Sequence, residues 1–94
     1  YMKNLNTTIA NNNQVLLLTL IQDAYSKGDY LLTEFLPGWE ALAEDERGEE
    51  YLVWWKERED WDGDDTGEAC DWDKPDKVTD SRGYWVDPDT VVIM

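Results

Sequence analysis

The chain has 94 residues with 22 Asp or Glu, 8 Lys or Arg and no His, so its formal net charge is −14 at pH 7. This length predicts a single small domain, and six tryptophans within a 41% hydrophobic composition favour a folded chain over a disordered one. The charge disfavours direct binding to DNA, RNA or anionic lipid, because those interactions depend on Lys and Arg.

The N-terminal part of the chain is predicted to be helical. Residues 1–12 are polar and rich in asparagine, so we expect a frayed lead, and Asn12 or Asn13 offers a helix cap. From Gln14 the apolar residues recur at helical spacing until Gly28 closes the segment. The apolar run within it is too short to span a bilayer, so no membrane association is expected.

Further helices are predicted in the middle of the chain. Asp29 caps a segment that Pro37 and Gly38 break, and helical spacing resumes at Trp39. The next segment, EEYLVWWKERED over 49–60, begins with two acids and carries basic residues toward its end, as the helix dipole favours. Its Tyr, Val and Trp residues also suit a strand, and helix is the preferred interpretation.

The C-terminal third changes character. Residues 60–77 combine few aliphatic side chains with many carboxylates, which predicts an acidic loop. The residues that follow predict short antiparallel strands near 77–80, 83–87 and 90–94. Two to three N-terminal helices, an acidic loop and a small C-terminal antiparallel β-hairpin or meander make the expected fold class α+β, in one domain over 1–94.

The tryptophans are expected to divide between the core and the surface. A chain with one Phe needs Trp to fill its core, and we expect Trp39, Trp55 and Trp85 to lie inside. One of Trp61 and Trp72 is expected to be exposed in the acidic loop.

Catalytic chemistry finds no support in the sequence. Without His the chain lacks the commonest general base and a usual zinc ligand, and one Cys cannot replace them. Cys70 lies among Glu68, Asp71 and Asp73, whose charges are expected to raise the pKa of its thiol. A single Cys also excludes an internal disulfide and indicates a reducing compartment. We therefore expect a cytoplasmic protein that is not an enzyme and needs no cofactor.

The acidic loop can be aligned with an EF-hand calcium loop, which needs oxygen ligands at fixed positions and glycine at the sixth. A register from Asp60 has the oxygens but places Asp65 where glycine belongs, and one from Asp62 corrects the glycine but puts Cys70 at a ligand position. Pro75 also obstructs the helix that should leave the loop. Calcium binding is an alternative interpretation, with the ligands Asp60, Asp62, Asp64, Thr66, Glu68 and Asp71.

The stretch WWKEREDWDGDDTGEACDWD, residues 54–73, combines dense negative charge with large aromatic side chains. Residues 57–94 carry a net charge of −9, whereas residues 2–28 contain one acid, Asp23. Carboxylates can occupy a Lys- and Arg-lined groove that normally holds DNA, and Trp stacks well on arginine. The predicted partner-binding residues are Glu57, Glu59, Asp60, Trp61, Asp62, Asp64, Asp65, Glu68, Asp71, Trp72, Asp73 and Asp76.

By its size, its charge and its scarcity of His and Cys, the chain resembles small phage-encoded inhibitors that act as DNA mimics. These include anti-CRISPR and anti-restriction proteins and inhibitors of uracil-DNA glycosylase. The resemblance implies a non-enzymatic inhibitor, monomeric or homodimeric, in the cytoplasm of an infected bacterium. Its implied partner is a basic nucleic-acid-binding protein, such as a CRISPR effector or another defence nuclease. A small phage structural or interaction protein is a further alternative.

Overall fold

The computed structural model describes residues 15–31 and 33–94, and the predicted frayed lead and its helix caps lie outside this part of the chain. Strands make up 46% of the described residues and short 3-10 turns 8%. The strands are β2 (Leu16–Leu20), β3 (Tyr25–Ser26), β4 (Asp29–Leu31), β5 (Glu34–Leu36), β6 (Gly38–Glu44), β7 (Glu50–Lys56), β8 (Lys77–Asp80), β9 (Trp85–Val86) and β10 (Val91–Ile93).

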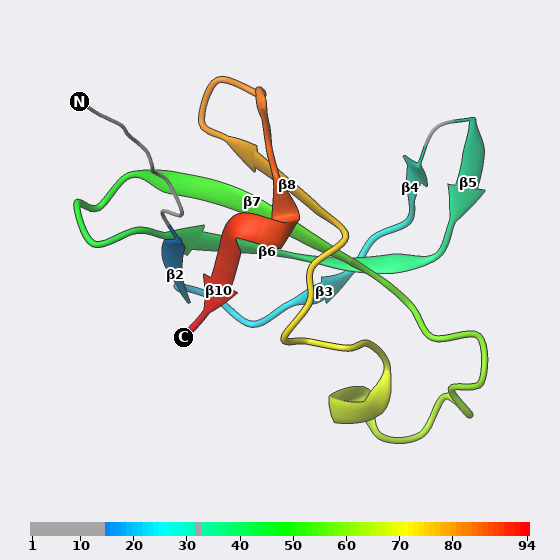
Figure 1. Ribbon diagram of the computed structural model, residues 1–94. Helices are drawn as coiled ribbons and strands as arrows, with labels where there is room; N and C mark the ends of the chain where they lie inside the picture. Colours follow the sequence, from blue (N-terminus) through cyan, green and yellow to red (C-terminus); the bar gives the residue numbers. More distant parts are fainter. Residues whose placement is uncertain (1–14, 32) are drawn as a thin grey trace.

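The strands form one strongly curled sheet and one separate hairpin (Figure 1). The sheet order is β10-β2-β6-β7-β8-β9, with β3 also paired to β6, while β4 and β5 pair only with each other. Neighbouring strands run antiparallel except β10 and β2, which are parallel and pair Val91 with Leu16. Strands from both ends of the described chain therefore meet at one edge of the sheet.

The long β6–β7 hairpin is the centre of the sheet, and its residues alternate between the two faces. Trp39, Ala41 and Ala43 of β6 point to the concave face, opposite large side chains of β7 such as Tyr51 and Val53. This small-against-large pairing lets the sheet curl around its own core, because side chains at alternate positions share one face. The turn between the strands contains Gly48 with φ +83°, a conformation that suits glycine.

The predicted α+β fold class and its N-terminal helices are wrong. No α-helix occurs in the described residues, and the two 3-10 turns are η1 (Thr66–Glu68) and η2 (Pro88–Thr90). The apolar spacing that suggested helices belongs to strands that pair with residues distant in the sequence. The segment from Gln14 to Gly28, where described, forms β2 and β3; the segment from Asp29 forms β4, β5 and β6; and 49–60 contains β7, so its preferred helical interpretation is also wrong.

The strands predicted in the C-terminal third coincide with β8, β9 and β10. β8 and β9 form the expected antiparallel hairpin, and its turn holds Gly83 at φ +85°. β10 does not continue this meander: η2 turns the chain, and β10 then pairs with β2. The arrangement of the last strand, rather than its position in the sequence, is what the prediction missed.

The hydrophobic core lies on the concave face. Trp55, Val53, Leu18 and Val78 are fully buried there. Trp85, which was expected inside, is 62% exposed. It pairs with Thr79, the neighbour of the buried Val78, and therefore lies on the convex face of the sheet. Its place as a buried tryptophan is taken by Trp54, which is only 2% exposed.

Trp54 is buried on the convex face, although Leu52 and Trp85 on the same face are exposed to solvent. The Trp54 ring lies against Gly38, and a Cβ at that position would overlap the indole. Its Nε1 donates a hydrogen bond of 2.7 Å to the carbonyl of Lys27, in the chain that crosses this face before β4. Gly38 is therefore needed because of the space that Trp54 occupies.

We expect Gly38→Ala to lower the free energy of unfolding by about 1–3 kcal/mol, since overpacking at a filled site forces the neighbours to shift. Urea denaturation measures this difference. In a Trp54→Leu background the same substitution should cost clearly less, because the overlapping ring is gone. Equal costs in both backgrounds would contradict the assigned contact.

Candidate functional site: an acidic loop on a tryptophan cluster

The acidic loop, residues 57–76, connects β7 to β8 and is held at its base by backbone hydrogen bonds. Glu57 N donates to the carbonyl of Pro37 at 3.0 Å, and Asp76 N donates to that of Trp54 at 2.9 Å. Farther out, Arg58 N donates to the carbonyl of Ala69 at 2.7 Å, so the outgoing and returning chains are tied together. Hydrogen bonds therefore fix the backbone within the loop as well as at its two ends.

Four tryptophans form a cluster beneath the acidic loop. Trp39 contacts Trp61 and Trp72 nearly at right angles, with ring centroids 6.0 and 6.2 Å apart. Trp72 also meets the fully buried Trp55, at a centroid distance of 4.9 Å. Edge-to-face contacts of this kind stabilise beyond simple area burial. The cluster therefore joins β6 and β7 to the loop.

Each indole N–H of this cluster is used to hold the chain. Trp61 Nε1 donates to the carbonyl of Asp65 at 2.8 Å, and Trp72 Nε1 to that of Gly67 at 3.0 Å. Trp55 Nε1 reaches into the loop from the sheet and donates to the carbonyl of Trp72 at 3.0 Å. Trp61 and Trp72 are both half-buried, so the prediction that one of them is exposed is wrong.

Two small residues of the acidic loop belong to the core. Ala69 is fully buried and Cys70 is 3% exposed. Burial, with the nearby charges of Glu57 and Asp76, raises the pKa of the Cys70 thiol to about 11. The expected direction is confirmed, but its main cause is burial rather than the adjacent carboxylates. A buried thiol with this pKa holds very little thiolate at neutral pH.

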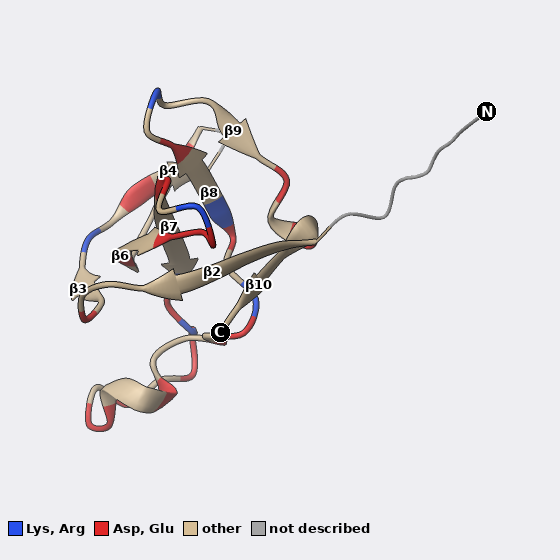
Figure 2. Ribbon diagram, turned by 90° about the vertical axis from the view of Figure 1, so that its left-hand side faces the viewer, with Lys and Arg blue, Asp and Glu red and all other residues tan. Residues whose placement is uncertain are grey.

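The outer part of the loop carries charge of one sign. Between Glu59 and Lys74 there are seven carboxylates and no Lys or Arg. None of the seven forms a salt bridge with a described residue, and Figure 2 shows the acidic segments around η1 with the basic segments at the root of the loop. All seven residues are exposed: Asp60, Asp62, Asp64, Asp65, Glu68, Asp71 and Asp73.

Two of these carboxylates also shape the loop. Asp62 accepts a hydrogen bond from Asp64 N at 2.9 Å, and Asp65 caps η1 by accepting one from Gly67 N at 2.9 Å. Such local bonds favour turns over regular structure. The side chains of the other five, including Asp64 and Glu68, form none of the hydrogen bonds found among the described residues.

The predicted partner-binding residues at the root of the loop lie in a mixed environment. Glu57 is turned inward, where it accepts from Trp39 Nε1 at 3.1 Å. Asp76 accepts from Lys56 N at 2.8 Å, and Glu59 pairs with the Lys56 ammonium at 3.5 Å. Arg58 and Lys74 line the same depression. The structure therefore separates a purely acidic outer part from a root in which both signs of charge meet.

The alternative calcium site does not form a ligand cage. Among the described residues, no three His, Cys, Asp or Glu side chains converge on a position suited to a metal ion. Asp62 and Asp65, which the two EF-hand alignments place at or beside ligand positions, instead bond to backbone N–H groups of the loop. In the described loop the carboxylates thus do not converge as the carboxylate ligands of a calcium ion do.

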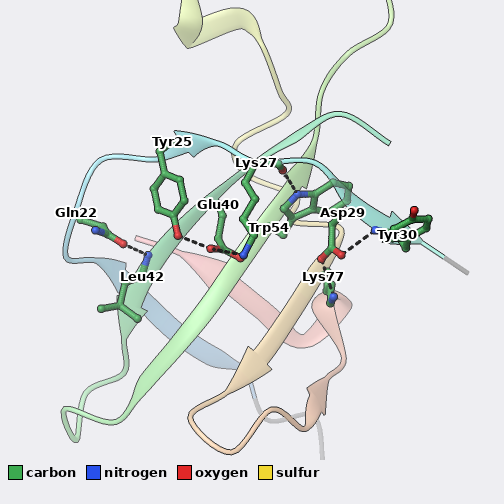
Figure 3. Close-up of polar contacts among 9 residues, drawn as sticks. All are labelled: Gln22, Tyr25, Lys27, Asp29, Tyr30, Glu40, Leu42, Trp54 and Lys77. Carbon is green, nitrogen blue, oxygen red and sulfur yellow. Dashed lines mark hydrogen bonds and ion pairs between the residues drawn. The ribbon is translucent and has the colours of Figure 1, made fainter. Parts of the chain in front are cut away.

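A polar network on the convex face fixes the segment that faces the acidic loop (Figure 3). The buried carboxylate of Glu40 accepts a hydrogen bond from the Tyr25 hydroxyl and lies 3.4 Å from the Lys27 ammonium. The hydrogen bond to Glu40 raises the pKa of the Tyr25 phenol, with burial and the charge of Glu40 adding to it. This contact attaches β3 to β6.

The chain before β3 is attached to β6 by two bonds at one residue. Ile21 N donates to the carbonyl of Leu42 at 2.9 Å. Leu42 N donates to the Gln22 side-chain oxygen at 3.0 Å (Figure 3). These bonds fix residues 20–24 beside Trp39. The sequence analysis did not assign residues 20–24 to a site. It predicted a helix for this segment, and the side chains of a helix would not have faced the acidic loop in this way.

A second ion pair connects the β4–β5 hairpin to the sheet. The Lys77 ammonium lies 2.7 Å from Asp29 Oδ2, and it also sits 5.6 Å from the Trp85 ring centroid. The hydrogen bond from Lys77 holds the pKa of the Asp29 carboxyl below its ordinary value, and burial opposes this shift. The other carboxylate oxygen accepts from Tyr30 N at 2.7 Å (Figure 3).

No family model, curated protein or solved structure matches the chain. Within the described residues, no helix has the length and apolar character needed to cross a membrane. A function for this chain therefore has to be inferred from the geometry and charge of the acidic loop and its surroundings.

Trp61→Phe should loosen the outer loop without emptying the cluster. Phe keeps an aromatic ring but cannot donate to Asp65, and losing such a bond costs about 1 kcal/mol, or roughly fivefold in a local opening equilibrium. Hydrogen exchange at the amides of Glu68 and Ala69 should speed up accordingly. Trp85→Phe, outside the cluster, is the control, and unchanged exchange in Trp61→Phe would contradict the anchoring role.

Asp29→Asn should destabilise the protein at neutral pH but not in acid. Because the folded pKa is lowered, the carboxylate stabilises the fold above its unfolded pKa of about 4, and the contribution is lost as pH falls through the folded pKa. Thermal unfolding should show a lower Tm for the variant at pH 7 and convergence with the native chain in acid. Glu34→Gln on the same hairpin should change little, and a pH-independent difference for Asp29→Asn would contradict the ion pair.

Proposed function

We propose that this chain is a non-enzymatic inhibitor whose acidic loop binds the Lys- and Arg-rich surface of a nucleic-acid-binding protein. One observation carries the proposal: seven carboxylates, with no cation between them in the sequence, project from a loop whose backbone is held by three indole hydrogen bonds. Proteins that grip DNA neutralise its phosphates with Lys and Arg, and clustered carboxylates compete for the same groups.

The anchored backbone matters for affinity. A mobile acidic segment would lose conformational entropy on binding, whereas a loop already held in place loses less. The mutual repulsion of the seven carboxylates opposes this order, and the Trp cluster offsets it. When a cationic groove binds the loop, this repulsion is relieved, so the energetic cost of gathering the charge is recovered in the complex.

The proposal assigns no catalytic step to the chain. Cys70 is buried with its thiol pKa raised to about 11, which disfavours a role as nucleophile. The tyrosine and lysine of the convex-face network are engaged with Glu40. Binding by charge and shape needs neither a nucleophile nor a general base.

The proposed partner is a defence nuclease, such as a CRISPR effector or a restriction enzyme, in a bacterial cytoplasm. The support is the resemblance in size and charge to phage-encoded DNA mimics, together with the rigid acidic surface. The chain would act there as a monomer or a homodimer. Competition with DNA for the same surface is the expected mode of inhibition.

Local rather than total charge should decide binding. We predict that neutralising Asp64, Glu68, Asp71 and Asp73 to Asn or Gln weakens binding at least about tenfold, because close charge pairs at interfaces couple strongly. A control with the same change in net charge neutralises Glu34, Glu46, Glu50 and Asp89, which are exposed. The control should retain most of the affinity.

The immobilised chain is to be incubated with bacterial lysate and eluted with excess duplex oligonucleotide, and the eluted protein then purified for binding measurements. The native chain should compete with duplex DNA for that protein, and the affinity should fall steeply as salt rises. Equal losses in both charge variants, or binding that neither DNA nor salt affects, would refute the proposal.

A further inference from the structure

An open groove of about 880 Å³ lies between the acidic loop and residues 20–24. Trp39 and Trp72 line it from the sheet and from the loop, with their rings 78° apart. Thr66 and Gly67 line it from η1, and Ile21 and Asp23 from the opposite side. Its size exceeds one side chain and suits a short segment of peptide.

The charge of the groove has one sign. Asp23 is the only charged residue among those that line it, and no Lys or Arg contributes to its walls in the described part of the chain. Among the described hydrogen bonds, none uses the Asp23 carboxylate or the Thr66 hydroxyl. Thr66 and Gly67, which line the groove, are flanked in the sequence by the exposed carboxylates of Asp65 and Glu68. The groove and the residues that flank it are therefore expected to attract a cation.

The two indoles select among cations. Aromatic faces attract a cation through their quadrupole, and Trp is the strongest of the side chains in this respect. A guanidinium is planar, weakly hydrated and able to stack, whereas the ammonium of lysine is compact and strongly hydrated. Arginine can stack on an indole while its N–H groups reach a carboxylate such as that of Asp23.

We propose that this groove receives an arginine of the basic partner, whose guanidinium stacks on one of the two perpendicular indoles, Trp39 or Trp72, turns its edge to the other and pairs with Asp23. This inference rests on the proposed function and names the recognition element within it. Aromatic walls also stack nucleobases, but the surrounding carboxylates repel the attached phosphates, so a nucleic-acid segment is the disfavoured occupant.

The probe is the acetylated and amidated pentapeptide Gly-Arg-Gly-Arg-Gly, with its lysine counterpart as the comparison. Titration followed by NMR of the indole N–H groups should shift the signals of Trp39 and Trp72 saturably, while Trp85 on the convex face stays unchanged. The arginine peptide should bind at least about threefold more tightly than the lysine peptide. Only a guanidinium can stack on an indole and donate two parallel hydrogen bonds to a carboxylate. A five-nucleotide oligothymidylate should produce no such shifts.

Two matched pairs of variants locate the contact. Thr66→Arg places a cation of the chain's own in the groove and should abolish peptide binding, whereas Ser81→Arg makes the same charge change in the β8–β9 turn and should not. Asp23→Asn should weaken binding several-fold, and Asp89→Asn should change it little. Circular dichroism and Tm establish that each variant is folded.

The outcomes separate this inference from the proposed function. If the loop charge variant loses the DNA-competed partner while Thr66→Arg and Asp23→Asn bind as the native chain does, the groove assignment is wrong and the proposed function stands. If the arginine peptide occupies the groove but the captured partner does not compete with DNA, the proposed function fails and the groove assignment stands. Equal binding of the two peptides, or shifts caused by the oligothymidylate, would overturn the arginine assignment.

Discussion

The acidic loop depends on Trp55. This fully buried side chain of β7 contacts Trp72 with its ring and donates its indole N–H to the carbonyl of the same residue. Carboxylates gathered on one loop repel each other, and an unanchored loop would relieve that repulsion by spreading. Apolar burial of Ala69 and Cys70 adds to the attachment, since it removes apolar surface from water. The sheet therefore supplies the free energy that keeps the charge concentrated.

The strands were hard to predict because their amino-acid composition favours helix, whereas their side chains alternate between two faces as in a strand. β6 reads GWEALAE, and its Ala, Leu and Glu are good helix formers. Its side chains nevertheless alternate between faces, with Ala41 and Ala43 in the core and Glu40 and Leu42 on the other side. Pairing with distant strands decides the outcome, and intrinsic propensity is a weak guide where such pairing dominates. β8 and β9 were predictable because Gly83 and the flanking β-branched residues mark a local hairpin.

The candidate site was predictable in its charge but not in its construction. The exposed acids of residues 60–73 follow directly from the sequence. Trp61 and Trp72 were predicted to contact a partner, and the sequence did not indicate that their indole N–H groups also hold the backbone of the loop. Residues 20–24 lie about forty residues away in sequence, and their position opposite the loop follows from the bonds to Leu42, which exist only in the sheet.

The parallel pairing of β10 with β2 has a consequence for the order of assembly. Val91 pairs with Leu16 across most of the described chain, whereas β6 and β7 are joined by a short turn. Closing a long stretch of chain costs more entropy than closing a hairpin, and folds rich in distant contacts form slowly. On these grounds we expect the meander from β6 to β9, which includes the tryptophan-anchored loop, to form first. We therefore expect the acidic surface to be established before β2 and β10 complete the sheet.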